Sequence, residues 1–245
     1  MISKYLIAIV TAFLSLSQAY AQNGEAIVKK MYDRYAKTWY RALTFDQTTE
    51  IYRNDSLFRT QQWHEAMLFP DKLRIDIEPL EKSNTIIFRS DSTYSIRGGK
   101  VARADKEGND LIFLLGGMYF HPYDKTIATL KALGYDLTKS GEGTFNGKPI
   151  YIIGATNQQD HNSQLWVDKE NLCLLRMIKY GGKEKEDGIF SNWIKIDGGY
   201  AETRVDFYVN DKLIQVEKYS NCKTPATIDE HIYDPNNYVK FSPAQ

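Results

Sequence analysis

Histidine and cysteine are scarce in this chain of 245 residues, which contains four and two of them, respectively. The histidines are His64, His121, His161 and His231, and none lies at metal-ligand spacing from another histidine or a cysteine. His64 is followed by Glu65 but lacks the second histidine of a zinc-protease helix. We therefore expect each histidine to be a surface or turn residue, and we expect no metal and no cofactor.

Motifs for catalysis and nucleotide binding are also lacking. The sequence has no Gly-x-Ser-x-Gly elbow, no phosphate-cradling glycine loop and no dinucleotide fingerprint. Its acidic residues are numerous but scattered, and Asp76 and Glu78 fall on the polar side of an alternating segment, where solvation explains them. The sequence therefore predicts a protein that is not an enzyme.

Two cysteines, Cys173 and Cys222, are too few for a disulfide scaffold. A bridge between them requires an oxidising compartment and a close approach of their Cα atoms. The sequence is compatible both with a disulfide between these cysteines and with two separate thiols.

The chain has no excess of charge of either sign, because 31 basic residues face 31 acidic ones. A balance near zero argues against nucleic-acid binding, which depends on neutralising phosphates. It also gives no reason to expect binding to anionic membrane surfaces. No apolar run approaches the ~20 residues that a membrane-spanning helix needs.

The first 21 residues have the pattern of a cleavable secretory signal peptide. Lys4 precedes an apolar stretch over residues 5–16, and Ala19 and Ala21 form a small-residue cleavage site. Cleavage after Ala21 exposes Gln22, which offers no thiol for lipid attachment, and removes one lysine and no acid, leaving a net charge of −1. We expect residues 22–245 to form one soluble domain in the periplasm.

A helical period appears in two places. Residues 24–40 place apolar side chains on one side at three- and four-residue spacing, which predicts an amphipathic helix. Residues 109–134 predict two short helices, at 111–119 and at 123–133, the second of which ends at Gly134. These helices interrupt a chain that is otherwise built of strands.

Alternation of apolar and polar residues dominates from Leu43 onward. Leu73, Ile75 and Ile77, for example, are each followed by a polar residue, as in a strand with one covered face. Residue pairs that tolerate positive φ separate such segments and predict tight antiparallel hairpins. These turns are Gly98-Gly99, Asn146-Gly147, Asp197-Gly198-Gly199 (between residues 189–196 and 200–209) and Asn210-Asp211.

The expected fold is mainly β: a single curved antiparallel sheet that forms an incomplete β-barrel, closed by the N-terminal helix and the inserted short helices. A curved sheet with helices in its mouth can leave part of its apolar surface as a cavity. A pocket for acyl chains needs apolar walls from both layers. The residues expected to line this lipid-binding cavity are Ile75, Ile77, Phe88 and Trp166 from the sheet, and Leu114 and Ile127 from the inserted helices.

The order of these elements resembles that of the LolA-like family of periplasmic lipoprotein carriers and the wider outer-membrane lipoprotein-sorting group. The residues that carry the resemblance are 68–75 (LFPDKLRI), 165–168 (LWVD) and 174–176 (LLR). It covers most of the chain after the signal peptide and implies an apolar cavity for the acyl chains of a lipoprotein or another lipid. Carriers of this family have an arginine near the second strand that holds the helical lid closed. Residues 67–70 (MLFP) contain none, and the nearby Arg74 faces away from Leu73 and Ile75.

The function expected from the sequence is lipid or lipoprotein binding in the cell envelope by a monomer, with donor and acceptor proteins as further partners. Two alternatives stay open: a protein- or glycan-binding interaction module and an envelope enzyme whose site is assembled from distant polar residues. The lipid-binding protein should purify with acyl chains, and the interaction module should have a filled core and exposed aromatics. The enzyme should have strongly perturbed ionisable groups clustered in a cleft.

Overall fold

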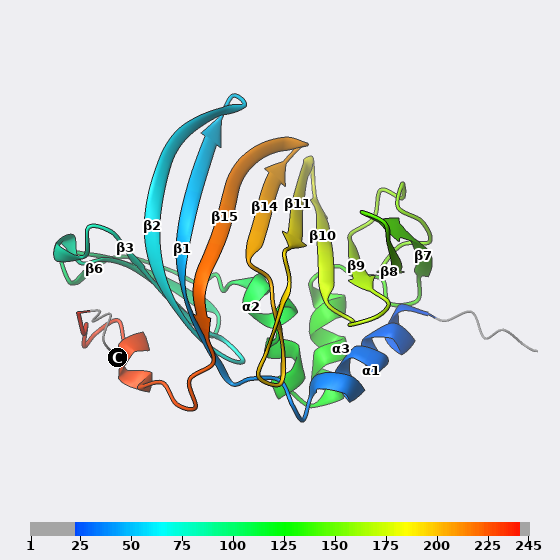
Figure 1. The fold of residues 1–245 in the computed structure, drawn as a ribbon, viewed down its shortest axis with the longest axis horizontal. Helices are drawn as coiled ribbons and strands as arrows, with labels where there is room; N and C mark the ends of the chain where they lie inside the picture. Colours follow the sequence, from blue (N-terminus) through cyan, green and yellow to red (C-terminus); the bar gives the residue numbers. More distant parts are fainter. Residues whose placement is uncertain (1–22, 241–245) are drawn as a thin grey trace, which may run out of the picture.

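A computed structural model describes residues 23–240, so the predicted signal peptide lies outside the described residues. The main feature is one curved antiparallel sheet of 13 strands that does not close into a barrel (Figure 1), which confirms the expected fold class. Its strands are β1 (Ala42–Arg53), β2 (Ser56–Leu68), β3 (Lys72–Ile77), β4 (Asn84–Arg89), β5 (Ser92–Arg97), β6 (Lys100–Asp105), β7 (Ser140–Phe145), β8 (Lys148–Ile153), β9 (Gln164–Asp168), β10 (Leu174–Gly181), β11 (Glu184–Ser191), β14 (Arg204–Val209) and β15 (Lys212–Lys223). They lie in the order β6-β5-β4-β3-β2-β1-β15-β14-β11-β10-β9-β8-β7.

The long strands β1, β2 and β15 form the middle of the sheet. Asn54 and Asp55, both with positive φ, make the tight turn between β1 and β2, because these residue types tolerate the left-handed region. Side chains alternate between the faces along each strand. The concave face therefore receives Trp63, Glu65 and Met67 of β2, all of which line the same cavity.

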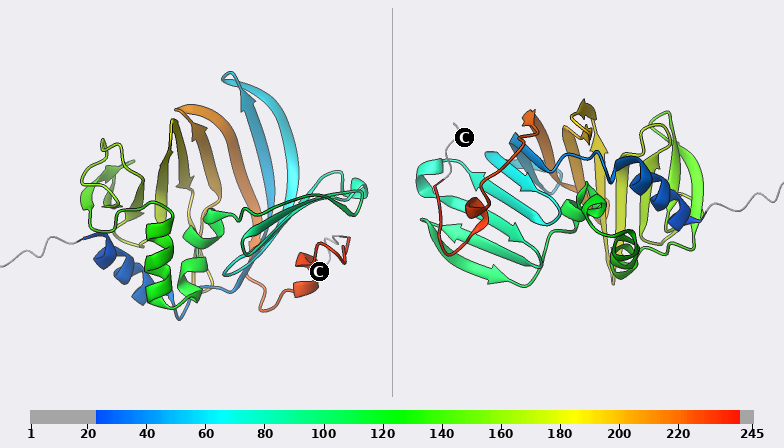
Figure 2. Two further views of the ribbon diagram at one scale, coloured as in Figure 1. Left: turned by 180° about the vertical axis from the view of Figure 1, so that it is seen from behind. Right: turned by 90° about the horizontal axis from the view of Figure 1, so that it is seen from below.

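Helices pack against the concave side of the sheet, as Figure 2 shows from two directions. They are α1 (Gly24–Tyr35), α2 (Asp110–Leu114) and α3 (Tyr123–Ala132), with a 3₁₀ turn, η2 (Gly117–Phe120), between the last two. The side chain of Asn23 caps α1 by accepting a hydrogen bond of 2.9 Å from the Ala26 N–H. Among the described residues, no helix is long and apolar enough to cross a membrane.

Two expected elements end earlier than the sequence predicts. The N-terminal helix stops at Tyr35 rather than residue 40, although Trp39 stays in the core with its ring 4.8 Å from that of Tyr35. Residues 189–196 do not form one strand, because the chain turns at Asn192, where φ is +54°. Beyond the turn, β12 (Ile194–Ile196) and β13 (Gly199–Ala201) form a separate two-stranded sheet around the predicted Asp197-Gly198-Gly199 turn.

The opposite face of the sheet is covered near β3 and β4 by the C-terminal segment, which contains the 3₁₀ turn η3 (Glu230–Tyr233). Tyr233 is fully buried there and packs with apolar side chains of the sheet. The expectation that Asp76 is a solvated surface residue is wrong, since it is 2% exposed and forms an ion pair with Arg74. The covering segment, which the alternation pattern could not reveal, removes this face of β3 from solvent.

The two cysteines are free thiols in the structure. Cys173 is buried and Cys222 is half-buried, and no bond joins them. Burial raises the pKa of both thiols, which favours the unreactive protonated form.

Leu130 offers a test of how much the helical layer contributes to stability. Its side chain is fully buried in the main core, so Leu130→Ala leaves a cavity and should lower the free energy of unfolding by about 2–5 kcal/mol. Denaturant unfolding of this variant should be compared with Lys125→Ala, an exposed position on the same helix α3. A loss of stability no larger than that of the control would contradict the packing described here.

Candidate ligand-binding site

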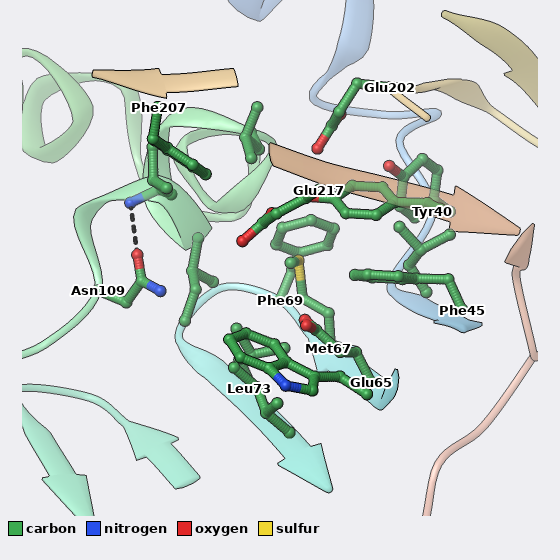
Figure 3. A pocket seen from close by; sticks show the side chains of 17 residues that line it. Tyr40, Phe45, Glu65, Met67, Phe69, Leu73, Asn109, Glu202, Phe207 and Glu217 are labelled. Carbon is green, nitrogen blue, oxygen red and sulfur yellow. Dashed lines mark hydrogen bonds between the residues drawn. The ribbon is translucent and has the colours of Figure 1, made fainter. Parts of the chain in front are cut away.

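A small cavity of about 80 Å³ lies on the concave face, between strands β1, β2, β3 and β15 and helix α2. Figure 3 shows the 17 side chains around it. Most are apolar, and several are aromatic. The aromatic members are Tyr40, Phe45, Trp63, Phe69, Phe207 and Tyr219.

A larger groove of about 570 Å³ adjoins this inner cavity. Trp63, Ile75 and Phe207 are among the residues that line both spaces, so the two lie side by side and are together called the hollow. The outer groove continues along the sheet to Ile86 and Phe88 of β4. Apolar side chains therefore extend along the outer groove from β3 to β4.

Helix α2 closes one side of the hollow, and Asn109 determines where the helix begins. The Asn109 side chain accepts a hydrogen bond of 3.0 Å from the Leu111 N–H, which caps the helix (Figure 3). Both residues line the inner cavity and the outer groove. The inserted helical segment thus provides the wall of the hollow that the curved sheet alone lacks.

Three glutamates point into the inner cavity from separate parts of the chain. Glu65 comes from β2, Glu217 from β15 and Glu202 from the link between β13 and β14, and Figure 3 shows all three directed into one space. Their exposed fractions are 6%, 9% and 8%, respectively. This cluster was not predicted from the sequence. The available signal was the position of Glu65 between Trp63 and Met67 on the covered side of an alternating strand.

The environment of the glutamates favours their neutral form. Burial raises the pKa of Glu202 to about 8, and the nearby Glu217 contributes to the shift. Burial, together with the negative charges of Glu217 and Glu202, raises the pKa of Glu65 well above its usual range. Burial also raises the pKa of Glu217, even though Gln215 donates a hydrogen bond of 2.6 Å to its carboxylate. Near neutral pH the cluster therefore holds protons that exposed glutamates would lose.

Basic groups are scarce around the hollow. No lysine, arginine or histidine is among the described residues that line the inner cavity. In the outer groove, Lys179 forms an ion pair of 2.7 Å with Asp110, while Glu107, Glu186 and Asp187 add further acidic groups. Within residues 23–240, no group of three or more His, Cys, Asp or Glu residues is arranged to hold a metal ion.

The structure brings several of the sequence-predicted cavity residues to one region. Ile75 lines both spaces and Phe88 lines the outer groove. Ile77 is half-buried against the same core, in which Leu114 of α2 and Ile127 of α3 are buried. The contact of these residues with a lipid stays a prediction.

Trp166 lies elsewhere. It is 3% exposed in a second apolar cluster with Ile150 and Ile152, and Phe145 packs against this cluster. Its indole N–H donates a hydrogen bond of 2.7 Å to the Gln164 side chain, so its polar atom is satisfied there. Trp166 is therefore not brought together with the residues around the hollow.

The raised pKa of Glu202 predicts a pH dependence of stability. Between the ordinary value of 4.5 and about 8, the folded protein keeps a proton that the unfolded chain loses. The folded state then binds more protons, so stability falls as pH rises through this window. We expect Glu202→Gln to flatten the fall in the free energy of unfolding between pH 5 and 8, measured by denaturation at several pH values. The exposed Glu184→Gln is the matched control, and equal slopes in the two variants would contradict the expectation.

Comparison with known proteins establishes the fold. No protein-family model and no curated protein matches the sequence. A DUF1329 family protein from Desulfovibrio piger superposes with a TM-score of 0.59 at 16% identity, over 87% of this chain and 96% of that one. A LolA superfamily protein from Nitrosomonas europaea gives 0.56 at 11% identity, over 87% and 98%.

A third solved structure, an outer membrane lipoprotein-sorting protein domain from Vibrio parahaemolyticus, gives a TM-score of 0.58 at 12% identity, over 88% of this chain and 97% of that one. The resemblance inferred from the sequence is therefore confirmed at the level of the fold. None of the three names specifies an enzymatic activity.

Proposed function

We propose that this protein binds lipids, or the acyl chains of lipoproteins, in the hollow between its curved sheet and its helices. The observation that carries the proposal is the hollow itself, which apolar and aromatic side chains surround from both layers. A ligand site of this kind is concave, mostly apolar and supplied with a few convergent polar groups. The fold shared with a lipoprotein-sorting protein domain supports the same assignment.

We further propose that the protein acts in the periplasm together with other envelope proteins. With the signal peptide of residues 1–21 removed after Ala21, the protein acts as a monomer in the periplasm, and it exchanges its cargo with donor and acceptor proteins of the envelope. The intact mass of the exported protein tests the first step. A chain that begins at Gln22 is expected, and a retained signal or an added lipid mass would count against it.

Ligand content is the direct test of the function. Mass spectrometry of solvent extracts from the purified, exported protein should detect acyl chains in a fixed ratio to protein. After delipidation, the same protein should bind an uncharged fluorescent acyl ester with a Kd on the order of 1 μM. An empty extract together with no probe binding would overturn the proposal.

An envelope enzyme is the second candidate, and the buried glutamates favour it, because clustered ionisable groups with shifted pKa values are common at catalytic sites. A carboxyl group with a pKa of about 8 can act as a general acid near neutral pH. Incubating acyl esters with the protein separates the two functions. A carrier returns the ester intact, whereas an enzyme converts it and loses that activity in Glu202→Gln.

A further inference from the structure

The charged residue types that line the inner cavity are all acidic, which an apolar chain alone does not require. Glu65, Glu202 and Glu217 are each more than nine-tenths buried, and no basic side chain lies among the described residues that line the inner cavity. Burying a carboxyl group costs free energy unless a hydrogen bond or an opposite charge compensates it. Three such groups in one cavity therefore need an explanation.

Glu65 is the least satisfied of the three. Tyr219 and Gln215 donate hydrogen bonds to Glu217, and the backbone N–H of Glu202 lies against its own carboxyl. No described residue donates a hydrogen bond to the Glu65 carboxyl, and the two charges that act on it most are those of Glu217 and Glu202. Its oxygens face the cavity (Figure 3), so a ligand can supply the missing partner.

The aromatic side chains of the inner cavity also favour a positively charged ligand. The rings of Phe45, Trp63, Phe207 and Tyr219 line the cavity that contains the carboxyl groups. The face of an aromatic ring attracts a cation, most strongly where water is excluded. Carboxyl groups and aromatic rings around one enclosed space are thus the two protein groups that best stabilise a bound ammonium.

From this arrangement we propose that the hollow is selective for an apolar chain that ends in an ammonium group. The ammonium enters the inner cavity and pairs with Glu65 and Glu217, and the chain lies in the outer groove along Ile75, Ile86 and Phe88. This inference rests on the proposed lipid-binding function and specifies the chemical class of ligand that the site takes.

The chemistry of the walls excludes close relatives of this ligand. A fatty acid would bring a fourth carboxyl group into a cavity that already holds three and whose described lining residues include no basic side chain to pair with it. An amine attached to a phosphate would bring an anion into a space whose other acidic groups include Glu107 and Glu186 of the outer groove. An ammonium group without a neighbouring anion is the headgroup that both the inner cavity and the outer groove accept.

Binding by three compounds of equal chain length tests the proposal. Isothermal titration of the delipidated protein at pH 7 with dodecylamine, dodecanol and dodecanoate should give the tightest Kd for dodecylamine, by about tenfold or more over dodecanol. The ammonium stabilises ionised glutamates that are otherwise protonated, so its binding should also release protons. Titration in two buffers of different ionisation enthalpy measures this release.

Glu65→Gln should remove most of the preference for the amine over dodecanol and reduce proton release. Glu217→Gln provides a second variant if the first does not fold, and the exposed Glu184→Gln is the control that should change nothing. Lyso-phosphatidylethanolamine should bind more weakly than dodecylamine.

The outcomes separate the two proposals. Equal binding of all three compounds, or a preference for the amine that survives in both cavity variants, would overturn the ammonium site and leave lipid binding standing. Binding of none of them would overturn both.

Discussion

Replacing Arg74 with methionine is expected to lower the free energy of unfolding by about 3–5 kcal/mol, because it leaves a buried charge without its partner. The Arg74 side chain is 1% exposed, and its guanidinium donates two hydrogen bonds to Asp76, of 2.6 and 2.9 Å. It also donates to the carbonyl oxygens of Ile232, at 2.9 Å, and Val239, at 2.7 Å. The substitution therefore removes two hydrogen bonds that hold the C-terminal segment to the sheet, and it leaves the buried Asp76 carboxylate without an opposite charge.

The exposed pair of Arg103 with Asp105 is the matched control. The Arg103 side chain is 73% exposed, so Arg103→Met should cost less than about 1 kcal/mol. Adding Asp76→Leu to Arg74→Met should recover a large part of the loss, because it removes the unpaired charge. Denaturant unfolding measures all three, and equal losses for Arg74→Met and Arg103→Met would show that the buried pair does not hold the segment in place.

Ile75→Glu should weaken binding of an uncharged fluorescent acyl ester by at least about tenfold. Ile75 lines both the inner cavity and the outer groove, and it lies directly opposite Glu65 in the pairing of β2 with β3. The substitution places another carboxyl group beside one that already lacks a partner. An apolar side chain of the binding site is thereby replaced by a carboxyl group, to which an acyl chain offers neither a hydrogen bond nor an opposite charge.

The same substitution at Ile194, which is 40% exposed on β12, should leave probe binding unchanged. Because Ile75 is 7% exposed, Ile75→Glu can also reduce stability, so thermal unfolding must accompany the titration. Phe88→Glu at the half-buried edge of the groove gives a second variant with a smaller folding cost. Unchanged binding in either variant, once shown to be folded, would contradict a ligand in the hollow.

The architecture was largely predictable because its signals are local. Alternation of apolar and polar residues identifies strands, and residues that tolerate positive φ identify the turns between them. Gly98, Gly147 and Gly198 all have positive φ in the structure, in the hairpins that the sequence predicts. The hairpins in turn require antiparallel neighbours, which leads to a single sheet.

The polar half of the site was not predictable in the same way, because it depends on contacts between distant segments. Glu65 and Glu217 are more than 150 positions apart in the sequence and meet only because β1 pairs with both β2 and β15. The placement of Trp166 depends similarly on which face of β9 is covered by the main core and which by the second cluster. The alternation of apolar and polar residues shows that a strand has two different faces, but it does not show which face lines a cavity.

The sheet ends in two strands, β6 and β7, whose outer edges pair with no other strand among the described residues. Unpaired edges are where copies of a protein add to one another and aggregate. Residues 100–104 of β6 are exposed, and this six-residue strand carries Lys100, Arg103 and Asp105. A short edge with charges is poorly suited to pairing with another chain. The charges on β6 thus protect this open sheet against self-association along that edge.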